Sequence, residues 1–97
     1  MATYILQINY TQQGIQNIKD SPARVDAFKS QLRSVGAELK AIYLVMGKFD
    51  FLAITEMPDE KTVATVCLSL NSLGNVRTET FRAFSEDEFQ GIVDSIP

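Results

Sequence analysis

The first segment of the chain alternates between apolar and mixed positions. Between residues 3 and 10 every second side chain is apolar, and the side chains between them include two amides. A period of two places alternate side chains on opposite faces of a β-strand. We therefore expect a strand at 3–10 with an apolar face formed by Tyr4, Leu6, Ile8 and Tyr10. Its second face is partly polar and carries Ile5, Gln7 and Asn9.

The next residues follow helical spacing. The segment 11–20 is mostly polar and predicts a loop with a short helix. Ser21 followed by Pro22 is typical of a helix N-terminus, with Ser as the N-cap and Pro at the first helical position. A helix over 22–35 then places four apolar residues on one stripe, and Gly36 supplies its C-cap. The stripe consists of Val25, Phe28, Leu32 and Val35.

A hairpin is predicted in the middle of the chain. Residues 38–46 and 49–57 are rich in β-branched and aromatic side chains, and Pro58 ends the second strand. Gly47 and Lys48 lie between the strands, which predicts a tight turn. The 38–46 strand is apolar on both faces. One face carries Leu39, Ala41, Tyr43 and Val45, and the other carries Ile42, Leu44 and Met46.

The remainder of the chain predicts a helix, a strand and a final helix. Asp59 caps a helix that ends at Gly74, and a strand follows at 76–84. Ser85, with Glu88 three positions later, forms a capping box that begins the final helix. The apolar stripe of the first of these helices is Val63, Val66, Cys67, Leu70 and Leu73. That of the final helix is Phe89, Ile92, Val93 and Ile96.

The order β-α-β-β-α-β with an extra C-terminal helix predicts an α+β ferredoxin-like sandwich, formed as one domain over residues 1–97. Both helices of such a unit pack on one face of the sheet. Apolar residues on the second face predict a partner, because large apolar patches are rarely left in water. We expect copies of this chain to pack sheet to sheet, as a homodimer or a higher multiple, and to close a barrel-like space between them.

The composition excludes several classes of site. The chain has no histidine and one cysteine. These counts exclude Ser-His and Cys-His nucleophile pairs, histidine-ligated zinc or haem, and disulfides within the chain. Glycine-rich phosphate-binding loops are also missing. We therefore expect neither a metal nor a cofactor.

Charge and hydropathy bear on partners and location. The basic residues are scattered and the net charge is −3, which argues against nucleic-acid binding. No apolar run is long enough for a transmembrane helix, so we expect no membrane association. The N-terminus lacks the basic region of a signal peptide, and a lone thiol fits a reducing compartment. These features favour a cytoplasmic protein.

Four stretches of the chain resemble the GYD domain family of small, mostly bacterial proteins. They are Thr11–Pro22, Gly47–Phe51, Ser72–Thr80 and Arg82–Phe89. The Gly-Tyr-Asp motif that names the family is matched here by Gly47-Lys48-Phe49-Asp50, with one residue interposed and Phe in place of Tyr. The resemblance implies a ferredoxin-like fold of the dimeric α+β barrel type, and it implies no established activity.

Two residues beside the predicted turn are candidates for a functional site. Phe49 and Asp50 would line the mouth of the barrel, with Asp50 as a hydrogen-bond acceptor or a general base. Turn chemistry also accounts for these residues, because Gly47 supplies a positive φ and Asp50 can cap backbone N–H groups. Both interpretations are compatible with the sequence.

Polar side chains within the strands form a second group of candidates. Arg77 and Glu79 share one face of the 76–84 strand, where Arg77 could hold a carboxylate. An ion pair at the rim of the sheet or between subunits is the alternative. Other polar groups within strands could orient a ligand or form hydrogen bonds across a dimer interface. They are Gln7, Asn9, Tyr43 and Thr55.

Three functions remain open at this point. The first is binding of a small molecule in the inter-subunit space without catalysis, which fits the absence of histidine best. The second is a cofactor-independent enzyme, oxygenase- or isomerase-like, with Asp50 or Glu79 as the base and Arg77 as the charge stabiliser. The third is an assembly or interaction subunit whose final helix, residues 86–96, docks on a partner.

Overall fold

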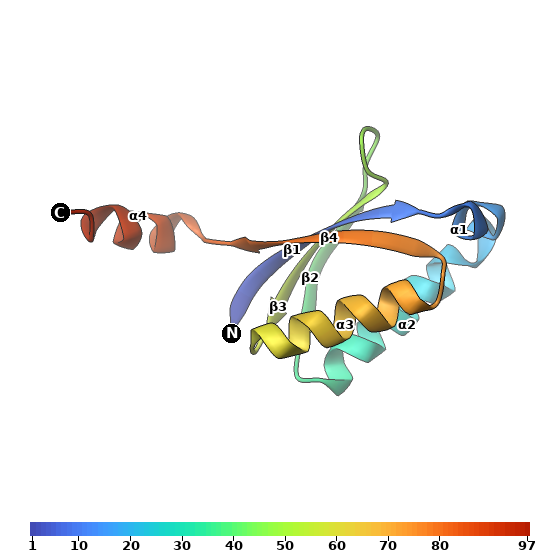
Figure 1. The fold of residues 1–97 in the computed structure, drawn as a ribbon, viewed down its shortest axis with the longest axis horizontal. Coiled ribbons are helices and arrows are strands. Elements are labelled where there is room, and N and C mark those ends of the chain that lie inside the picture. The colour runs from blue at the N-terminus through green and yellow to red at the C-terminus, as the bar shows by residue number, and fades with distance from the viewer.

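The computed structural model describes all 97 residues and contains one four-stranded antiparallel sheet (Figure 1). The strand order is β2-β3-β1-β4, so β2 and β4 form the edges. This topology confirms the predicted ferredoxin-like α+β sandwich with an extra C-terminal helix. The strands are β1 (Ala2–Tyr10), β2 (Glu38–Leu44), β3 (Phe51–Met57) and β4 (Val76–Ala83). The helices are α1 (Gln12–Gln16), the 3₁₀ turn η1 (Ile18–Asp20), α2 (Ser21–Ser34), α3 (Glu60–Ser72) and α4 (Glu86–Asp94).

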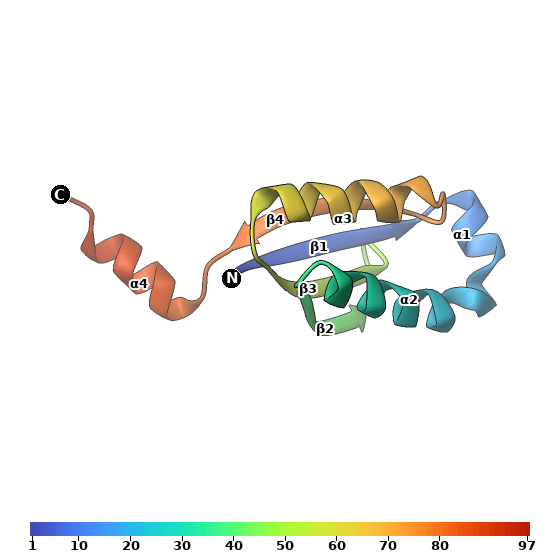
Figure 2. The same cartoon turned by 90° about the horizontal axis from the view of Figure 1, so that it is seen from below.

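The helices α2 and α3 cover one face of the sheet and leave the opposite face open (Figures 1 and 2). The connection at 45–50 rises on the open side (Figure 1). The helix α4 does not join this two-layer body, because it follows β4 beyond the end of the sheet and points away (Figure 2). We call the face of the sheet opposite α2 and α3 the open face.

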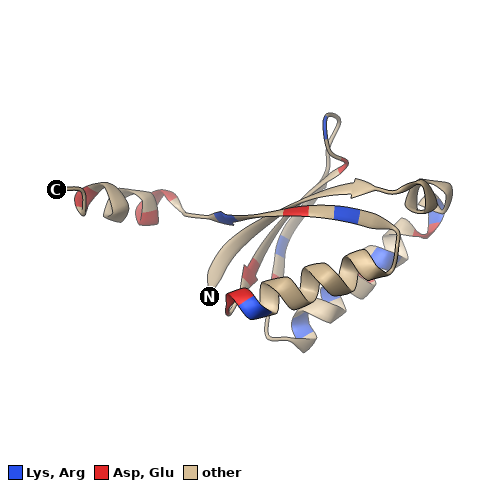
Figure 3. Cartoon of the chain, viewed as in Figure 1, with Lys and Arg blue, Asp and Glu red and all other residues tan.

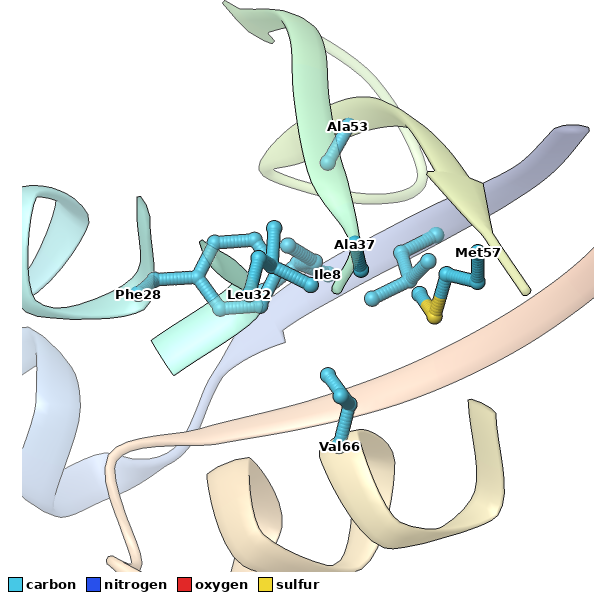
Figure 4. Packing of buried hydrophobic residues seen from close by; sticks show 8 residues of the cluster. Ile8, Phe28, Leu32, Ala37, Ala53, Met57 and Val66 are labelled. Carbon is cyan, nitrogen blue, oxygen red and sulfur yellow. The ribbon is translucent and has the colours of Figure 1, made fainter. Parts of the chain in front are cut away.

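The core lies between the sheet and the two covering helices, and Figure 4 shows its packing. Leu6 from β1, Leu32 from α2 and Val66 from α3 are completely buried there. Burying an aliphatic side chain of this size contributes ~1.5–3 kcal/mol to folding, so these residues hold the two layers together. The full set of buried apolar residues is Leu6, Ile8, Phe28, Leu32, Ala37, Ala53, Met57 and Val66.

The predicted caps of α3 and α4 are confirmed in the structure. The Asp59 carboxylate accepts a hydrogen bond from the Thr62 N–H at 2.8 Å. Ser85 and Glu88 form the reciprocal capping box at the start of α4. The backbone hydrogen bond from Thr62 holds the pKa of Asp59 below its usual range. The backbone hydrogen bond from Ser85 likewise lowers the pKa of Glu88, so both carboxylates are stabilised in their ionised form.

The segment after β1 is bonded to the turn before β4. The Thr11 N–H donates to the Asn75 carbonyl at 3.0 Å, and the Thr11 hydroxyl donates to the Gly74 carbonyl at 2.6 Å. Gly14 is buried at this junction, where an added Cβ would lie 1.9 Å from the Asn75 carbonyl oxygen. Gly74 has a φ of 84°, which ends α3 in the left-handed region that glycine adopts without strain. Two of the stretches that resemble the GYD family therefore meet in space.

The expectation that Ser21 is the N-cap of its helix is wrong. Ser21 is the first residue of α2, and Asp20 occupies the N-cap position without a side-chain hydrogen bond. Because η1 runs directly into α2, the Ser21 N–H already donates to the Ile18 carbonyl. The Ser21 hydroxyl instead forms a 2.7 Å hydrogen bond with the Tyr10 hydroxyl, which ties α2 to the end of β1.

The turn between β2 and β3 is longer than the tight turn expected at 47–48. Since β3 begins at Phe51, residues 45–50 form the connection. The Asp50 N–H donates to the Ile8 carbonyl of β1 at 2.9 Å. Asp50 is therefore held by β1 and belongs to the connection instead of the strand.

A β-bulge changes which face of β2 carries Leu39. The register shifts between Leu39 and Ala41, with Leu39 opposite Thr55 and Ala41 opposite Ile54. Strict alternation predicts that Leu39 shares the open face with Tyr43. In the structure, Leu39 instead packs against the core beneath the helices. A single bulge residue moves one side chain to the other face, because side chains alternate along a strand.

Candidate functional site

The centre of the open face is apolar. Ile5 on β1 lies opposite Ile54 on β3 and Phe81 on β4. Along β3, Leu52 lies on the same face opposite Tyr43 of β2. Phe81 on the edge strand β4 is 45% exposed, because no helix covers this face. An apolar cluster left in this position is typical of a surface that contacts another molecule.

Polar side chains replace apolar ones toward one end of the open face. Asn9 on β1 lies opposite Arg77 on β4, and Gln7 lies opposite Glu79. Opposed residues of an antiparallel pair have Cβ atoms ~4.5–5.5 Å apart, so these four side chains form one patch. Arg77 and Glu79 share a face, as the alternation along the strand predicts.

The 45–50 connection turns this patch into a pocket. The loop stands on the open side of the sheet (Figure 1) and contributes Lys48 and Phe49 to the lining. The cavity has a volume of about 360 Å³, which is suited to a small ligand. We call it the polar pocket. Its lining consists of Gln7, Asn9, Tyr10, Lys48, Phe49, Arg77, Thr78 and Glu79.

The charged groups of the polar pocket have no ion-pair partners within the chain. The ion pairs of the chain join Lys40 to Glu38 and Arg82 to Glu88, and neither includes a residue of the pocket lining. A guanidinium and the Lys48 ammonium can bind a carboxylate, and the Glu79 carboxylate can bind an ammonium. The amides of Gln7 and Asn9 add both donors and acceptors. The pocket therefore offers complementary groups for a small molecule that carries both charges.

Asp50 makes structural contacts at the edge of the loop. Its carboxylate accepts a hydrogen bond from the Tyr10 N–H at 2.9 Å, while its own N–H donates to Ile8. These two bonds fasten the 45–50 connection to β1, and Asp50 is not part of the pocket lining. The predicted capping of backbone N–H groups by Asp50 accounts for these contacts, whereas the neighbouring Phe49 lines the pocket. The positive φ predicted for Gly47 is wrong, because the glycines with a positive φ are Gly36 and Gly74 and the longer connection replaces the tight turn that would require one.

Two further polar candidates lie away from the polar pocket. Tyr43 is on the edge strand β2, 57% exposed, with β3 and β1 between it and β4. Thr55 faces the helices, is completely buried and donates to the Tyr4 carbonyl at 2.9 Å. Of the predicted site residues, the structure brings five together in the pocket: Gln7, Asn9, Phe49, Arg77 and Glu79.

Lys48 is a lining residue that the sequence pattern does not single out. The pattern assigns it to a tight turn, where its side chain would have no defined neighbours. The signal that points to it is its position beside Phe49, as the basic residue of the 45–50 connection. Only the longer loop, standing over the open face, places its side chain in the same lining as Arg77.

The chain has neither a metal-binding cluster nor a membrane-spanning helix. No group of three or more His, Cys, Asp or Glu side chains is arranged to hold a metal ion. None of the helices has the length and apolar character needed to cross a membrane. Cys67 is half-buried and its Sγ lies 3.1 Å from the Thr80 hydroxyl, so its environment is that of a packed side chain.

A curated relative covers most of the chain. A protein of Thermus thermophilus, named glutamine synthetase and cystathionine beta-lyase binding protein, is 34% identical over 84 residues. The matched region spans 86% of this chain and 88% of that protein, so the two are comparable in extent.

Solved structures share the fold. A feast or famine regulatory protein from M. tuberculosis, complexed with L-methionine, superposes with a TM-score of 0.67 at 15% identity, over 88% of this chain and 51% of that one. A protein from Thermus thermophilus superposes with a TM-score of 0.56 at 25% identity, over 88% of this chain and 95% of that one. The leucine response regulatory protein of Mycobacterium tuberculosis gives 0.57 at 14% identity, over 87% and 51%. The chain thus spans about half the length of the two mycobacterial regulators, and its likeness to them is one of fold.

The family model of the GYD domain matches residues 4–93. This range includes nearly all of the four-stranded sheet, the covering helices and most of α4. The match confirms the resemblance inferred from the four sequence stretches, two of which meet where Thr11 bonds to Asn75. The chain belongs to the GYD domain family.

Proposed function

We propose that this protein is a non-catalytic binding protein that pairs sheet to sheet with a second copy and holds a small charged molecule in the polar pocket. The observation that carries the proposal is the pocket's lining, in which two cations, one carboxylate and two amides converge. The pocket lies at the end of the open face, next to the apolar centre. Binding of a second copy would therefore close it from the side that faces solvent.

The apolar centre of the open face supports the pairing. Ile5, Ile54 and Phe81 lie side by side across three strands, and each is only partly buried within one copy. Covering such side chains gains ~25 cal/mol for each Å² of apolar surface removed from water. A second copy presents the same surface, so a two-fold interface would be self-complementary.

The charges of the polar pocket support a ligand with a carboxylate and an amine. Arg77 and Lys48 can bind the carboxylate, and Glu79 can bind the ammonium group. Charge-assisted hydrogen bonds of this kind are about twice as strong as neutral ones. A free amino acid is the simplest molecule that satisfies both ends, and its side chain would extend toward the apolar centre of the open face.

The placement of Asp50 supports binding without catalysis. The catalytic alternative uses Asp50 or Glu79 as the base, but the Asp50 carboxylate is bonded to the Tyr10 N–H and lies outside the pocket lining. Glu79 then remains as the one carboxylate of the site, between residues that bind and orient. The catalytic alternative therefore depends on Glu79 alone as its base.

Isothermal titration calorimetry with each of the common free amino acids tests this function. We expect at least one to bind, and we expect Arg77→Ala to weaken that binding tenfold or more, consistent with loss of a charged hydrogen bond worth ~1.5–3 kcal/mol. Lys61→Ala is the matched control, because Lys61 is an exposed cation on α3 outside the pocket. Absence of binding by every amino acid would contradict the proposed ligand class. Equal losses in both variants would contradict the proposed site.

A second candidate function is binding to a metabolic enzyme. It is favoured by the curated relative, whose name describes binding to glutamine synthetase and cystathionine beta-lyase. Sedimentation of this protein mixed with each purified enzyme tests the candidate directly. Co-sedimentation with either enzyme would support it, and separate boundaries for both enzymes at micromolar concentrations would oppose it.

A further inference from the structure

In a single copy, the helix α4 lies outside the two-layer body formed by the sheet, α2 and α3. It follows β4 past the end of the sheet, and the chain is 52 Å long in this direction (Figures 1 and 2). None of its residues is buried. Helices of this length are marginal in water without tertiary packing. We therefore expect α4 to pack against another molecule. We call residues 85–97, which include α4, the arm.

One side of the arm is apolar. The apolar residues repeat at the spacing of a helical stripe and stay exposed, from 40% for Val93 to 66% for Ile96. Phe89, Ile92 and Val93 form the stripe on α4. Ile96, predicted to continue it, lies beyond the last helical residue, Asp94. This face is the part of the arm that would be buried on docking.

The start of the arm is fixed in direction. The Arg82 guanidinium lies 4.3 Å from the centre of the Phe84 ring and forms an ion pair with Glu88 at 3.4 Å. The same Glu88 closes the capping box with Ser85. Because these contacts join the end of β4 to the first turn of α4, the helix leaves the sheet along a defined path.

The arm is acidic. Its charged residues are all carboxylates, as the red bands on α4 in Figure 3 show. They are Glu86, Asp87, Glu88 and Asp94. A site that receives this helix should combine an apolar floor with basic side chains.

A groove of that character lies where α2 ends and β2 begins. It has a volume of about 520 Å³ and includes the apolar side chains of Met1 and Leu39. Lys29 and Arg33 of α2 supply two cations to its lining. Glu38 is the one acidic residue there, and it is paired at 3.8 Å with a lysine outside the lining. We call this the α2–β2 groove.

The arm and the α2–β2 groove lie at the same end of the sheet, on opposite edges. Thr3 of β1 is opposite both Ala83, the last residue of β4, and Glu56 of β3. Glu56 is in turn opposite Glu38, the first residue of β2. Ala83, Thr3, Glu56 and Glu38 therefore form one row across the sheet. This row runs from the strand end where the arm begins to the residue of β2 that lines the groove.

We infer that α4 of one copy docks in the α2–β2 groove of a second copy. The inference rests on the sheet-to-sheet pairing proposed above. A two-fold axis parallel to the strands places β4 of one copy over β2 of the other and keeps the ends of the strands together. Each arm then leaves its own sheet beside the groove of its partner, with the acidic residues of the arm near Lys29 and Arg33.

Cross-linking of the full chain tests this arrangement. In a Cys67→Ala background, a chain with Ser30→Cys and Pro97→Cys is treated with a short bis-maleimide, and the linked peptides are identified by mass spectrometry. Ser30 is exposed beside Lys29 and outside the groove lining, so both groove cations and the apolar residues of the arm are kept. We expect a covalent dimer joined between positions 30 and 97. The matched control carries Leu68→Cys and Pro97→Cys, because Leu68 is 72% exposed on α3, outside the groove, and should not be linked.

Sedimentation of the same samples before cross-linking separates the two proposals. A dimer that gives the 30–97 linkage and little 68–97 linkage supports the docked arm. A dimer without the 30–97 linkage, or with both linkages at equal yield, overturns the docked arm and leaves the sheet-to-sheet pairing intact. A monomer would overturn the pairing, and the docked arm with it.

Discussion

The two faces of the sheet are built from alternate residues of the same strands, yet they differ in almost every physical respect. On the covered face, Leu6 lies between Ala53 and Thr80 and is completely sealed by α2 and α3. One residue earlier, Ile5 lies between Ile54 and Phe81 with no helix above it. The covered face completes its packing within one chain, and the open face does not.

The polar and charged side chains of the two faces also differ in their bonding partners. Polar side chains on the covered face are bonded internally, as Thr55 is to the Tyr4 carbonyl. On the open face, Arg77 and Glu79 have no ion-pair partner in the chain. We conclude that the covered face determines whether the chain folds, and we expect the open face to determine what it binds.

The largest expected effect comes from truncating the covered face. Leu6→Ala should lower the free energy of unfolding by ~2–5 kcal/mol, because it leaves a cavity in a sealed core. Ile5→Ala is the matched control on the same strand. Urea unfolding at several protein concentrations distinguishes the two variants. The decrease in the free energy of unfolding should not depend on protein concentration for Leu6→Ala, and it should for Ile5→Ala. Equal, concentration-independent losses would mean that the two faces do not differ in this way.

A charge on the open face should act on pairing instead of folding. Ile54→Asp places a carboxylate in the apolar centre, where burial against a second copy costs several kcal/mol. We expect the dissociation constant of the dimer to rise ~100-fold or more, with the helical content of the chain preserved. Sedimentation equilibrium together with circular dichroism measures both. An unchanged dissociation constant would show that this surface is not the interface.

The covered side also depends on a close approach at Gly14. Gly14→Ala forces a methyl group against the Asn75 carbonyl, and we expect a loss of ~1–3 kcal/mol as the backbone shifts. Gly91→Ala in α4 is the control, since a Cβ there meets no atom within 4 Å. That change should leave stability unchanged or raise it by up to ~1 kcal/mol through helix propensity. Thermal unfolding of the two variants gives the comparison, and a Gly14→Ala variant as stable as Gly91→Ala would contradict the packing at the junction.

The smallest expected effect is acid fraying of the helix starts. The pKa values of Asp59 and Glu88 are lowered in the folded chain, so each carboxylate contributes stability at neutral pH that is lost as the pH falls below about 4. Packing holds α3, whereas α4 depends more on its caps within one copy. In the monomeric Ile54→Asp variant, amide NMR spectra should show α4 unwinding before α3. Adding Glu88→Gln should remove the pH dependence while keeping a capping box, and unwinding of α3 first would oppose this account.

Most of the fold follows from patterns within single segments. The capped helices and the strands are specified by local spacing, which is why Asp59 and the Ser85 capping box could be located from the sequence. The errors occur where a distant contact overrides the local signal. Ser21 is displaced from its predicted role by the turn η1, and Leu39 is moved to the covered face by a bulge against β3.

The candidate site was less predictable than the fold. Alternation along the strands placed Arg77 and Glu79 on one face of β4, so that part of the polar pocket could be anticipated. The contribution of Lys48 depends on a loop whose length is decided by the bonding of Asp50 to β1. Spacing in the sequence does not reveal that a residue between β2 and β3 will share a lining with residues of the opposite edge strand β4.

Native mass spectrometry of the gently purified protein tests the central claim most directly, because it reports the oligomer and any retained ligand together. We predict a dimer, or a multiple of it, that carries the additional mass of a small molecule, and the same chain with Ile54→Asp should lose both the pairing and that mass. A monomer across the micromolar range would contradict the claim that the open face is built to be covered by a second copy.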